Sequence, residues 1–296
     1  MTPAARGPRV VAVGGGHGLA ATLRAASHYA CHITAVVATA DDGGSTGRLR
    51  SALDMPAPGD LRRCVEAMAG DDGTPLAGAL EYRFAGSDVE GHALGNLLLA
   101  GLHATSGDFV AAVDELSRVA GLDPSAQRVL PATIDPVVLR AEASGGRRIA
   151  GQVAITRTVG VERVVVEPGT ARVPDEVVGA LADADQVVLG PGSLFTSVLA
   201  AAVVDDVRDA VKRSSGRTVY VCNVRAEAGE TRGYDVAAHV AALRRHGIEP
   251  DVVVAQRGAL AVGDPGVDVV QADVVRPHGL AHDPVLLGEV LAGLTA

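Results

Sequence analysis

The sequence predicts an α/β fold: a doubly wound, mostly parallel, Rossmann-like sheet with a small antiparallel β appendage. Short apolar runs alternate with helix-length segments along most of the chain, and several of these runs end in glycine-rich loops. Continuous apolar runs are typical of strands that are covered on both faces. The middle of the chain instead contains short runs that favour β-strands. We therefore expect one α/β domain over 1–296, with 136–170 as a β-hairpin appendage within it.

The N-terminal half alternates strands and helices. The run 9–13 predicts a strand, 14–18 a glycine turn and 19–27 an Ala/Leu-rich helix. A second buried-type strand is expected over 33–39. Asp60 is placed to cap a helix over 61–69, because Asp at this position accepts hydrogen bonds from the first helical N–H groups. Two further helices are expected, over 97–104 and 109–120.

The middle segment contains short runs rich in β-branched residues. The runs 136–143, 152–158 and 163–168 predict strands, and 144–147 (SGGR) predicts a hairpin turn between the first two. The α/β alternation then returns. The expected elements are helix 175–184, strand 186–189, helix 194–204, strand 218–222, helix 234–246, strand 251–255 and helix 284–294.

Composition excludes several classes of function. The net charge of −9 opposes general nucleic-acid binding, which needs a basic face. Lys212 is the only lysine, so the chain has no P-loop Gly-Lys-Ser/Thr and no strong Schiff-base candidate. The three cysteines form no C-x-x-C pair, which fits a reducing compartment. Residues 1–9 contain no apolar signal core, and the longest apolar run, 198–204, is far shorter than the ~20 residues of a membrane span. We expect a cytoplasmic protein without a membrane span.

The first two candidate loops follow the two N-terminal strands, where an open parallel sheet binds ligands. The run 14–18 (GGGHG) permits close approach of a phosphate to a helix N-terminus, although a tight strand–helix turn is the alternative. It is not a G-x-G-x-x-G fingerprint.

In 41–48 (DDGGSTGR), Asp41 and Asp42 could bind a ribose, hold Mg²⁺ with substrate phosphates or act as a base. Ser45 and Arg48 offer donors to an anion, and an Asx turn with a capped helix is the alternative.

Two further loops complete the candidate set. The run 190–193 (GPGS) again places glycines and a hydroxyl between a strand and a helix. Phe195, which follows it, is either a stacking residue for a base or sugar or a core residue of the first helical turn. Asn96, in 91–96 (GHALGN), is either a helix cap or a ligand donor. Among the histidines, His17 is expected to contact ligand, whereas His278 and His282 are expected to be structural.

These motifs together resemble the YvcK/GlmR family of bacterial gluconeogenesis factors. The matching runs are GGGHGL at 14–19, DDGGSTGR at 41–48, PGDLR at 58–62, GH and GN within 91–96, VLP at 129–131, GPGSL at 190–194, Asn223, GET at 229–231 and HDP at 282–284. Two departures are Arg63, where the family pattern has Asn, and 226–228 (AEA), where Gln-Pro is usual before GET.

The resemblance implies a CofD-like fold that binds UDP-N-acetylglucosamine or a related UDP-sugar. It implies a regulatory role linking carbon metabolism to cell-envelope precursor synthesis, with glucosamine-6-phosphate synthase as a partner. The sister branch, CofD, transfers 2-phospho-lactate to a deazaflavin alcohol with Mg²⁺ and a guanosine diphosphate donor, and such a transferase is our alternative. An NAD-dependent oxidoreductase is disfavoured because the run 14–19 lacks the third glycine of the G-x-G-x-x-G motif.

We therefore expect a UDP-sugar binder without strong turnover, and we also expect a homodimer. No cofactor is required, except that Asp41 and Asp42 could hold Mg²⁺ together with a phosphate ligand. No catalytic residue is assigned. The residues expected to contact ligand are Gly15, Gly16, His17, Gly18, Asp41, Asp42, Gly43, Gly44, Ser45, Arg48, Asp60, Arg62, Asn96, Gly190, Pro191, Gly192, Ser193, Phe195, Thr196 and Asn223.

Overall fold

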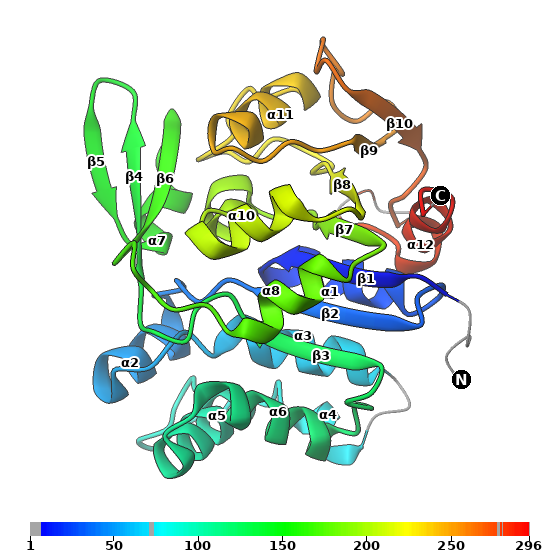
Figure 1. The fold of residues 1–296 in the computed structure, drawn as a ribbon. Helices are drawn as coiled ribbons and strands as arrows, with labels where there is room; N and C mark the ends of the chain where they lie inside the picture. Colours follow the sequence, from blue (N-terminus) through cyan, green and yellow to red (C-terminus); the bar gives the residue numbers. More distant parts are fainter. Residues whose placement is uncertain (1–6, 71–73, 277–278, 280, 296) are drawn as a thin grey trace.

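A seven-stranded sheet, parallel at every pairing, forms the centre of the protein in a computed structural model (Figure 1). The structure describes residues 7–70, 74–276, 279 and 281–295. The strand order is β10-β9-β8-β7-β1-β2-β3. The strands are β1 (Arg9–Gly14), β2 (His32–Val37), β3 (Gln127–Pro131), β7 (Gln186–Leu189), β8 (Arg217–Val221), β9 (Val252–Gln256) and β10 (Asp268–Ala272). The predicted fold class is confirmed.

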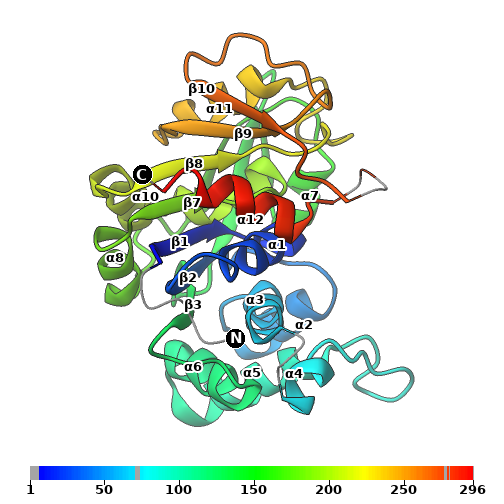
Figure 2. The same cartoon turned by 90° about the vertical axis from the view of Figure 1, so that its right-hand side faces the viewer.

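Helices cover both faces of this sheet, because successive side chains of a strand point to opposite faces. In β1, Val10 and Ala12 belong to one core cluster, and Val11 and Val13 belong to the other. The first face carries α1 (Gly16–Ala26), α3 (Gly59–Ala69) and α12 (Pro284–Ala292), which lie in front of the sheet in Figure 2. The second carries α8 (Asp175–Ala182), α9 (Leu199–Ala202), α10 (Asp205–Arg213) and α11 (Val236–Arg245).

Further helices lie beyond the β3 edge. They are α4 (Pro75–Ala79), α5 (Leu94–Ser106) and α6 (Phe109–Ala120), and α2 (Gly44–Leu53) lies near them at the end of α5 (Figure 1). Asp108 and Thr74 cap α6 and α4 with their side-chain oxygens. None of the helices in the described part of the chain is long and apolar enough to cross a membrane.

A three-stranded antiparallel sheet stands beside α10 and α11 (Figure 1). It contains β4 (Val138–Ala143), β5 (Arg147–Ala150) and β6 (Val161–Glu167) in the order β5-β4-β6. The predicted hairpin turn joins β4 to β5. Its buried side chains, such as Leu139 and Val164, join the second core cluster, so this sheet packs onto the body of the protein.

Several predicted elements are wrong or were missed. The run 152–158 is not a strand: it forms α7 (Gln152–Thr156), which follows Gly151 at φ 94°. Strands β3, β5 and β10 and helix α4 were not predicted, and a helix at the position of α2 was expected only in the alternative interpretation of 41–48. The expected helix 194–204 is divided into a π-helix, η1 (Leu194–Val198), followed by α9. Asp60 does not cap α3, which begins at Gly59, and its carboxylate instead reaches another loop.

Candidate functional site

The topological switch point of the sheet lies between β1 and β7. The chain runs outward from β1 through β2 to β3, and it later returns to β7 at the other side of β1. Ligands of open α/β sheets bind outside the strand ends at such a point. The loops that follow these two strands are the glycine-rich runs 14–18 and 190–193 predicted from the sequence.

These two glycine loops meet backbone to backbone. A Cβ atom on Gly18 would overlap the carbonyl oxygen of Pro191, far inside the 3.0 Å below which real Cβ atoms essentially never approach another atom. A Cβ on Gly15 would lie 2.6 Å from a carboxylate oxygen of Asp60. Gly18 therefore needs glycine for space, because backbone atoms face it, whereas a side chain at Gly15 would require the Asp60 carboxylate to shift. The N-terminus of α1 lies at this junction, where its first N–H groups have no partner within the helix.

A cavity of about 250 Å³ opens beside this junction. It is lined by His17, Gly18, Ala21, Pro191, Gly192, Asn223, Val224, Arg225, Glu227, Ala281 and His282. The side chain of Asn223 fixes one wall, because its Oδ1 accepts a hydrogen bond of 2.9 Å from the backbone N–H of Gly192. The cavity thus presents both cationic and anionic side chains next to the glycine loops.

His282 contributes a buried imidazole to this cavity. It is 7% exposed, and its Nε2 has no hydrogen-bond partner among the described residues. Burial lowers the pKa of His282 to about 4, so the ring is neutral at physiological pH. The ring hydrogen-bonds the backbone of Cys222, and its Nε2 is a buried atom beneath the cavity surface. His282, expected from the sequence to be structural, is thus a buried residue of the cavity lining. His278 lies outside the described residues.

Asp60 connects the first glycine loop to α3. Its Oδ2 accepts a hydrogen bond of 2.8 Å from the backbone N–H of Gly16, and its Oδ1 pairs with Arg63. A carboxylate is favourable at a helix N-terminus, and the Arg63 guanidinium offsets its charge. The residue that departs from the family pattern at position 63 thus contacts this site directly.

Asp41 and Asp42 point to different partners. Asp41 accepts a hydrogen bond from the N–H of Gly43, and burial, together with the charge of Asp60, raises its pKa. Asp42 accepts a hydrogen bond of 2.9 Å from the N–H of Val153 and so stabilises the first turn of α7. Within the described residues, no group of three or more His, Cys, Asp or Glu side chains could hold a metal ion. Each of the two carboxylates is engaged by a backbone N–H at its Oδ1.

The loop 41–48 also contributes to a buried cluster of polar side chains. The hydroxyl of Ser45 lies 3.0 Å from Nδ1 of His92 and accepts a hydrogen bond of 3.1 Å from Asn96. All three side chains are buried, and Oδ1 of Asn96 has no partner among the described residues. Arg48 lies outside this cluster and donates to the carbonyl of Glu90. Asn96 therefore anchors the second loop to α5, and it does not cap that helix.

The segment after β8 forms hydrogen bonds with the loop 190–193 and with the residues that follow it. Glu227 accepts a hydrogen bond of 2.8 Å from the Ser193 hydroxyl, and Glu230 accepts one of 3.1 Å from the N–H of Phe195. Glu230 is 1% exposed, and burial, reinforced by the nearby Glu227, raises its pKa to about 8. This segment thus fixes the start of η1, and π-helical turns occur frequently at functional sites.

Comparisons with known proteins agree on one family. The family model for 2-phospho-L-lactate transferase CofD matches residues 10–273. The chain belongs to the CofD-like family. A gluconeogenesis factor of Halalkalibacterium halodurans is 38% identical, over 95% of this chain and 84% of that protein. A Mycobacterium tuberculosis relative is 42% identical, over 97% of this chain and 90% of its own length. A crystal structure of a Bacillus halodurans protein of the UPF0052 family has a TM-score of 0.91 at 33% identity, covering 97% of this chain and 99% of that one.

Three residues expected to contact ligand are buried in the core of this CofD-like protein. Phe195 is fully buried, and its ring packs edge-on against Tyr234 and His246, so it cannot stack on a nucleotide base. Arg62 is 1% exposed beneath Gly95 and pairs with Glu66 and Glu81. Its role is to neutralise carboxylates within the fold. Thr196 is also buried, 3.3 Å from the hydroxyl of Thr156 in α7.

Reasoning from sequence missed four residues around the site of this CofD-like protein: Arg225, Glu227, Glu230 and His282. Two of them lie in runs that match the family pattern, GET at 229–231 and HDP at 282–284. That pattern was the only available signal, because these runs lie far along the chain from the glycine loops. Their positions became evident only when β8 and α12 were placed beside β7 and α1.

Proposed function

We propose that this CofD-like protein binds UDP-N-acetylglucosamine or a related UDP-sugar at the switch point. The observation that supports this most strongly is the backbone contact of Gly18 with Pro191, which brings two glycine loops and the N-terminus of α1 together. Backbone N–H groups at a helix N-terminus favour phosphate. The diphosphate would lie along these loops, and the adjoining cavity would receive other parts of the ligand.

The cavity offers the polar groups that recognition of a nucleotide sugar requires. Arg225 can pair with a phosphate, whereas Glu227 can bond to hydroxyl or amide groups of a sugar or a nucleoside. We propose a regulatory role in the cytoplasm, connecting carbon metabolism with cell-envelope precursor synthesis through glucosamine-6-phosphate synthase, with the protein acting as a homodimer. The name of the H. halodurans relative, gluconeogenesis factor, supports the metabolic part of this role.

A thermal-shift panel of nucleotides tests the proposed ligand. UDP-N-acetylglucosamine, UDP, GDP and GDP-sugars are compared at equal concentrations, because a ligand at 100 times its Kd stabilises a protein by about 2.7 kcal/mol. We expect the largest rise in melting temperature with UDP-N-acetylglucosamine. The rise should be smaller in Asn223→Ala, which removes the acceptor for the Gly192 N–H. Stabilisation by GDP but not by UDP-sugars would overturn the proposal.

A CofD-type transferase is the second candidate, supported by the family model that matches most of the chain. Mg²⁺ is commonly bound by one or two carboxylates together with substrate phosphates, and Asp41 fits that role. Asp42 could contribute as well, since only its Oδ1 is engaged by the backbone N–H of Val153. Incubation with the deazaflavin alcohol, lactyl diphosphoguanosine and Mg²⁺ tests this candidate. Formation of a phosphodiester product that is lost in Asp41→Asn would favour transfer over regulation.

A further inference from the structure

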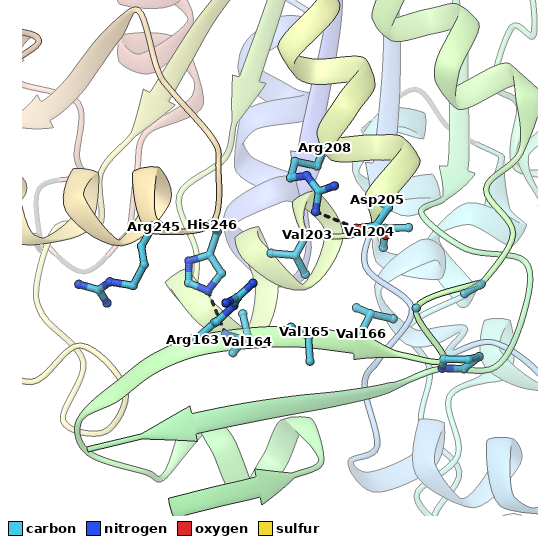
Figure 3. Close-up of a pocket in the computed structure, with 13 residues that line it drawn as sticks. Arg163, Val164, Val165, Val166, Val203, Val204, Asp205, Arg208, Arg245 and His246 are labelled. Atoms are coloured by element: carbon cyan, nitrogen blue, oxygen red, sulfur yellow. Dashed lines mark hydrogen bonds and ion pairs between the residues drawn. The ribbon is translucent and has the colours of Figure 1, made fainter. Parts of the chain in front are cut away.

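A second cavity, of about 230 Å³, lies between the small antiparallel sheet and the body of the protein. Figure 3 shows it bounded by β6, by the junction of α9 with α10 and by the end of α11. It shares no lining residue with the cavity at the glycine loops. Because its volume is several times the ~30 Å³ of a water molecule and below the ~300 Å³ of typical ligand pockets, it suits a small occupant.

The lining of this cavity combines apolar walls with positive charge. Valines 164, 165, 166, 203 and 204 are among the apolar residues of the lining. Three arginines, Arg163, Arg208 and Arg245, and a single carboxylate, Asp205, contribute the charges. Asp205 pairs with Arg208, which also contacts Asp209. Arg245 donates a hydrogen bond to the carbonyl of Glu162 and also interacts with the Tyr234 hydroxyl, and no carboxylate among the described residues forms an ion pair with it.

Arg163 is the cation best placed to hold an anion here. Its side chain forms no hydrogen bond or ion pair with any residue that the structure describes, whereas its backbone belongs to the β4–β6 pairing. The pairing of β4 with β6 shifts register between Glu142 and Ala143, next to the position where Arg163 faces Glu142. Such bulges re-aim side chains. Arg163 lies beside His246 in Figure 3, and its charge contributes to the lowered pKa of that ring.

The imidazole ring of His246 lines the cavity, and it is fixed in place and uncharged. Its Nδ1 donates to the carbonyl of Ala242 at 2.7 Å, and its Nε2 accepts from the N–H of Val164 at 2.9 Å. Both ring nitrogens are therefore occupied, and the ring adds no positive charge. It packs edge-on against Phe195, with the ring centroids 5.9 Å apart. The recognition of an anion is thus assigned to the guanidinium groups, which match phosphate geometry in a bidentate manner.

We propose that this cavity is a binding site for a small phosphate monoester, with the phosphate on Arg163 and Arg245 and a short apolar group against the valines. The site is independent of the UDP-sugar proposal, since no residue is shared. A phosphate monoester fits better than inorganic phosphate because the valines give the lining a large apolar part. It fits better than a carboxylate because two separate guanidinium groups can share three terminal oxygens.

NMR titration of the ¹⁵N-labelled protein with n-butyl phosphate tests the proposal. We expect saturable shifts of the Val164 amide, which contacts His246, and weaker binding of inorganic phosphate and of butyrate. Arg163→Gln should raise the Kd about tenfold or more, the loss expected for a charge-assisted hydrogen bond. Because the Arg163 side chain has no partner within the described residues, this change should leave the fold intact, which the remaining amide spectrum will report.

Arg148→Gln is the matched control. Arg148 is exposed on the neighbouring strand β5 of the same sheet and does not line this cavity, so its loss should leave the Kd unchanged. Three results would overturn the proposal: absence of saturable shifts near Val164, an equal Kd for wild type and Arg163→Gln, or shifts confined to the glycine loops. Butyrate binding as tightly as butyl phosphate would overturn the assignment of a phosphate head group.

Discussion

Substitution of Gly18 by alanine tests the packing at the centre of the site. Gly18 lies in the first turn of α1, and its backbone does not require glycine conformationally. Helix propensity alone therefore predicts that alanine stabilises the protein by up to about 1 kcal/mol. The new Cβ, however, would lie 1.3 Å from the Pro191 oxygen, whereas ordinary contacts begin at 3.4 Å. One of the two loops must consequently move by about 2 Å.

The steric overlap determines whether Gly18→Ala stabilises or destabilises the protein. Overpacking in a well-packed region costs ~1–3 kcal/mol and occasionally more, and this overlap involves backbone on both sides. We therefore expect Gly18→Ala to destabilise the protein by about 2 kcal/mol after the gain in helix propensity is subtracted. Binding at the switch point should weaken as well, because displaced loops no longer present their N–H groups together.

Urea denaturation measures the stability change, with a lowered midpoint at an unchanged slope as the expected result. Gly101→Ala is the control: Gly101 lies in α5, and a Cβ added there would have no atom within 4 Å, so alanine should stabilise at this position. If Gly18→Ala were as stable as wild type and bound UDP-N-acetylglucosamine equally well, the proposed contact between the loops would be refuted.

Three further substitutions address the surroundings of the site. The pKa of Glu230 is raised from 4.5 to about 8, so the folded state retains a proton that the unfolded state has lost between these values. Stability should therefore fall as pH rises through this window, by up to about 1.4 kcal/mol per pH unit, and Glu230→Gln should remove that slope in urea unfolding. Asp42→Ala should cost about 1 kcal/mol and speed hydrogen exchange at the Val153 amide. Asn223→Ala should cost ~1–3 kcal/mol by leaving the Gly192 N–H without its acceptor, and calorimetry should record weaker UDP-sugar binding.

Each of these expectations has a contradicting outcome. An unchanged pH slope in Glu230→Gln would mean that this carboxyl is ionised in the folded protein. Unaltered protection of Val153 in Asp42→Ala would show that α7 does not depend on the Asp loop. Full UDP-sugar affinity in Asn223→Ala would separate the Gly192 loop from ligand binding.

The fold class could be predicted because its signals are local. The apolar run of β1 and the glycines after it mark a buried strand and a tight turn without reference to the rest of the chain. The error over 152–158 has the opposite origin. Valine, isoleucine and threonine favour strands, but Gly151 turns the chain at positive φ and the distant Asp42 stabilises the first helical turn. Tertiary contacts overrode propensity there.

The site could be predicted only in part. Glycine loops at strand ends converge in any parallel sheet, so Gly18 and Gly192 could be placed near one another in advance. The burial of Phe195 depends on Tyr234 and His246, which lie far from it in the sequence. The burial of Arg62 likewise depends on Glu81, which is distant in the sequence. Side chains whose environment is built by distant segments cannot be assigned from their own motif.

A crystal structure of the protein with UDP-N-acetylglucosamine tests the central claim most directly. The account predicts the diphosphate in the crevice between the loops 14–18 and 190–193, with the rest of the ligand reaching Asn223 and His282. A UDP-sugar bound elsewhere on the protein, with these two loops free of phosphate, would contradict it.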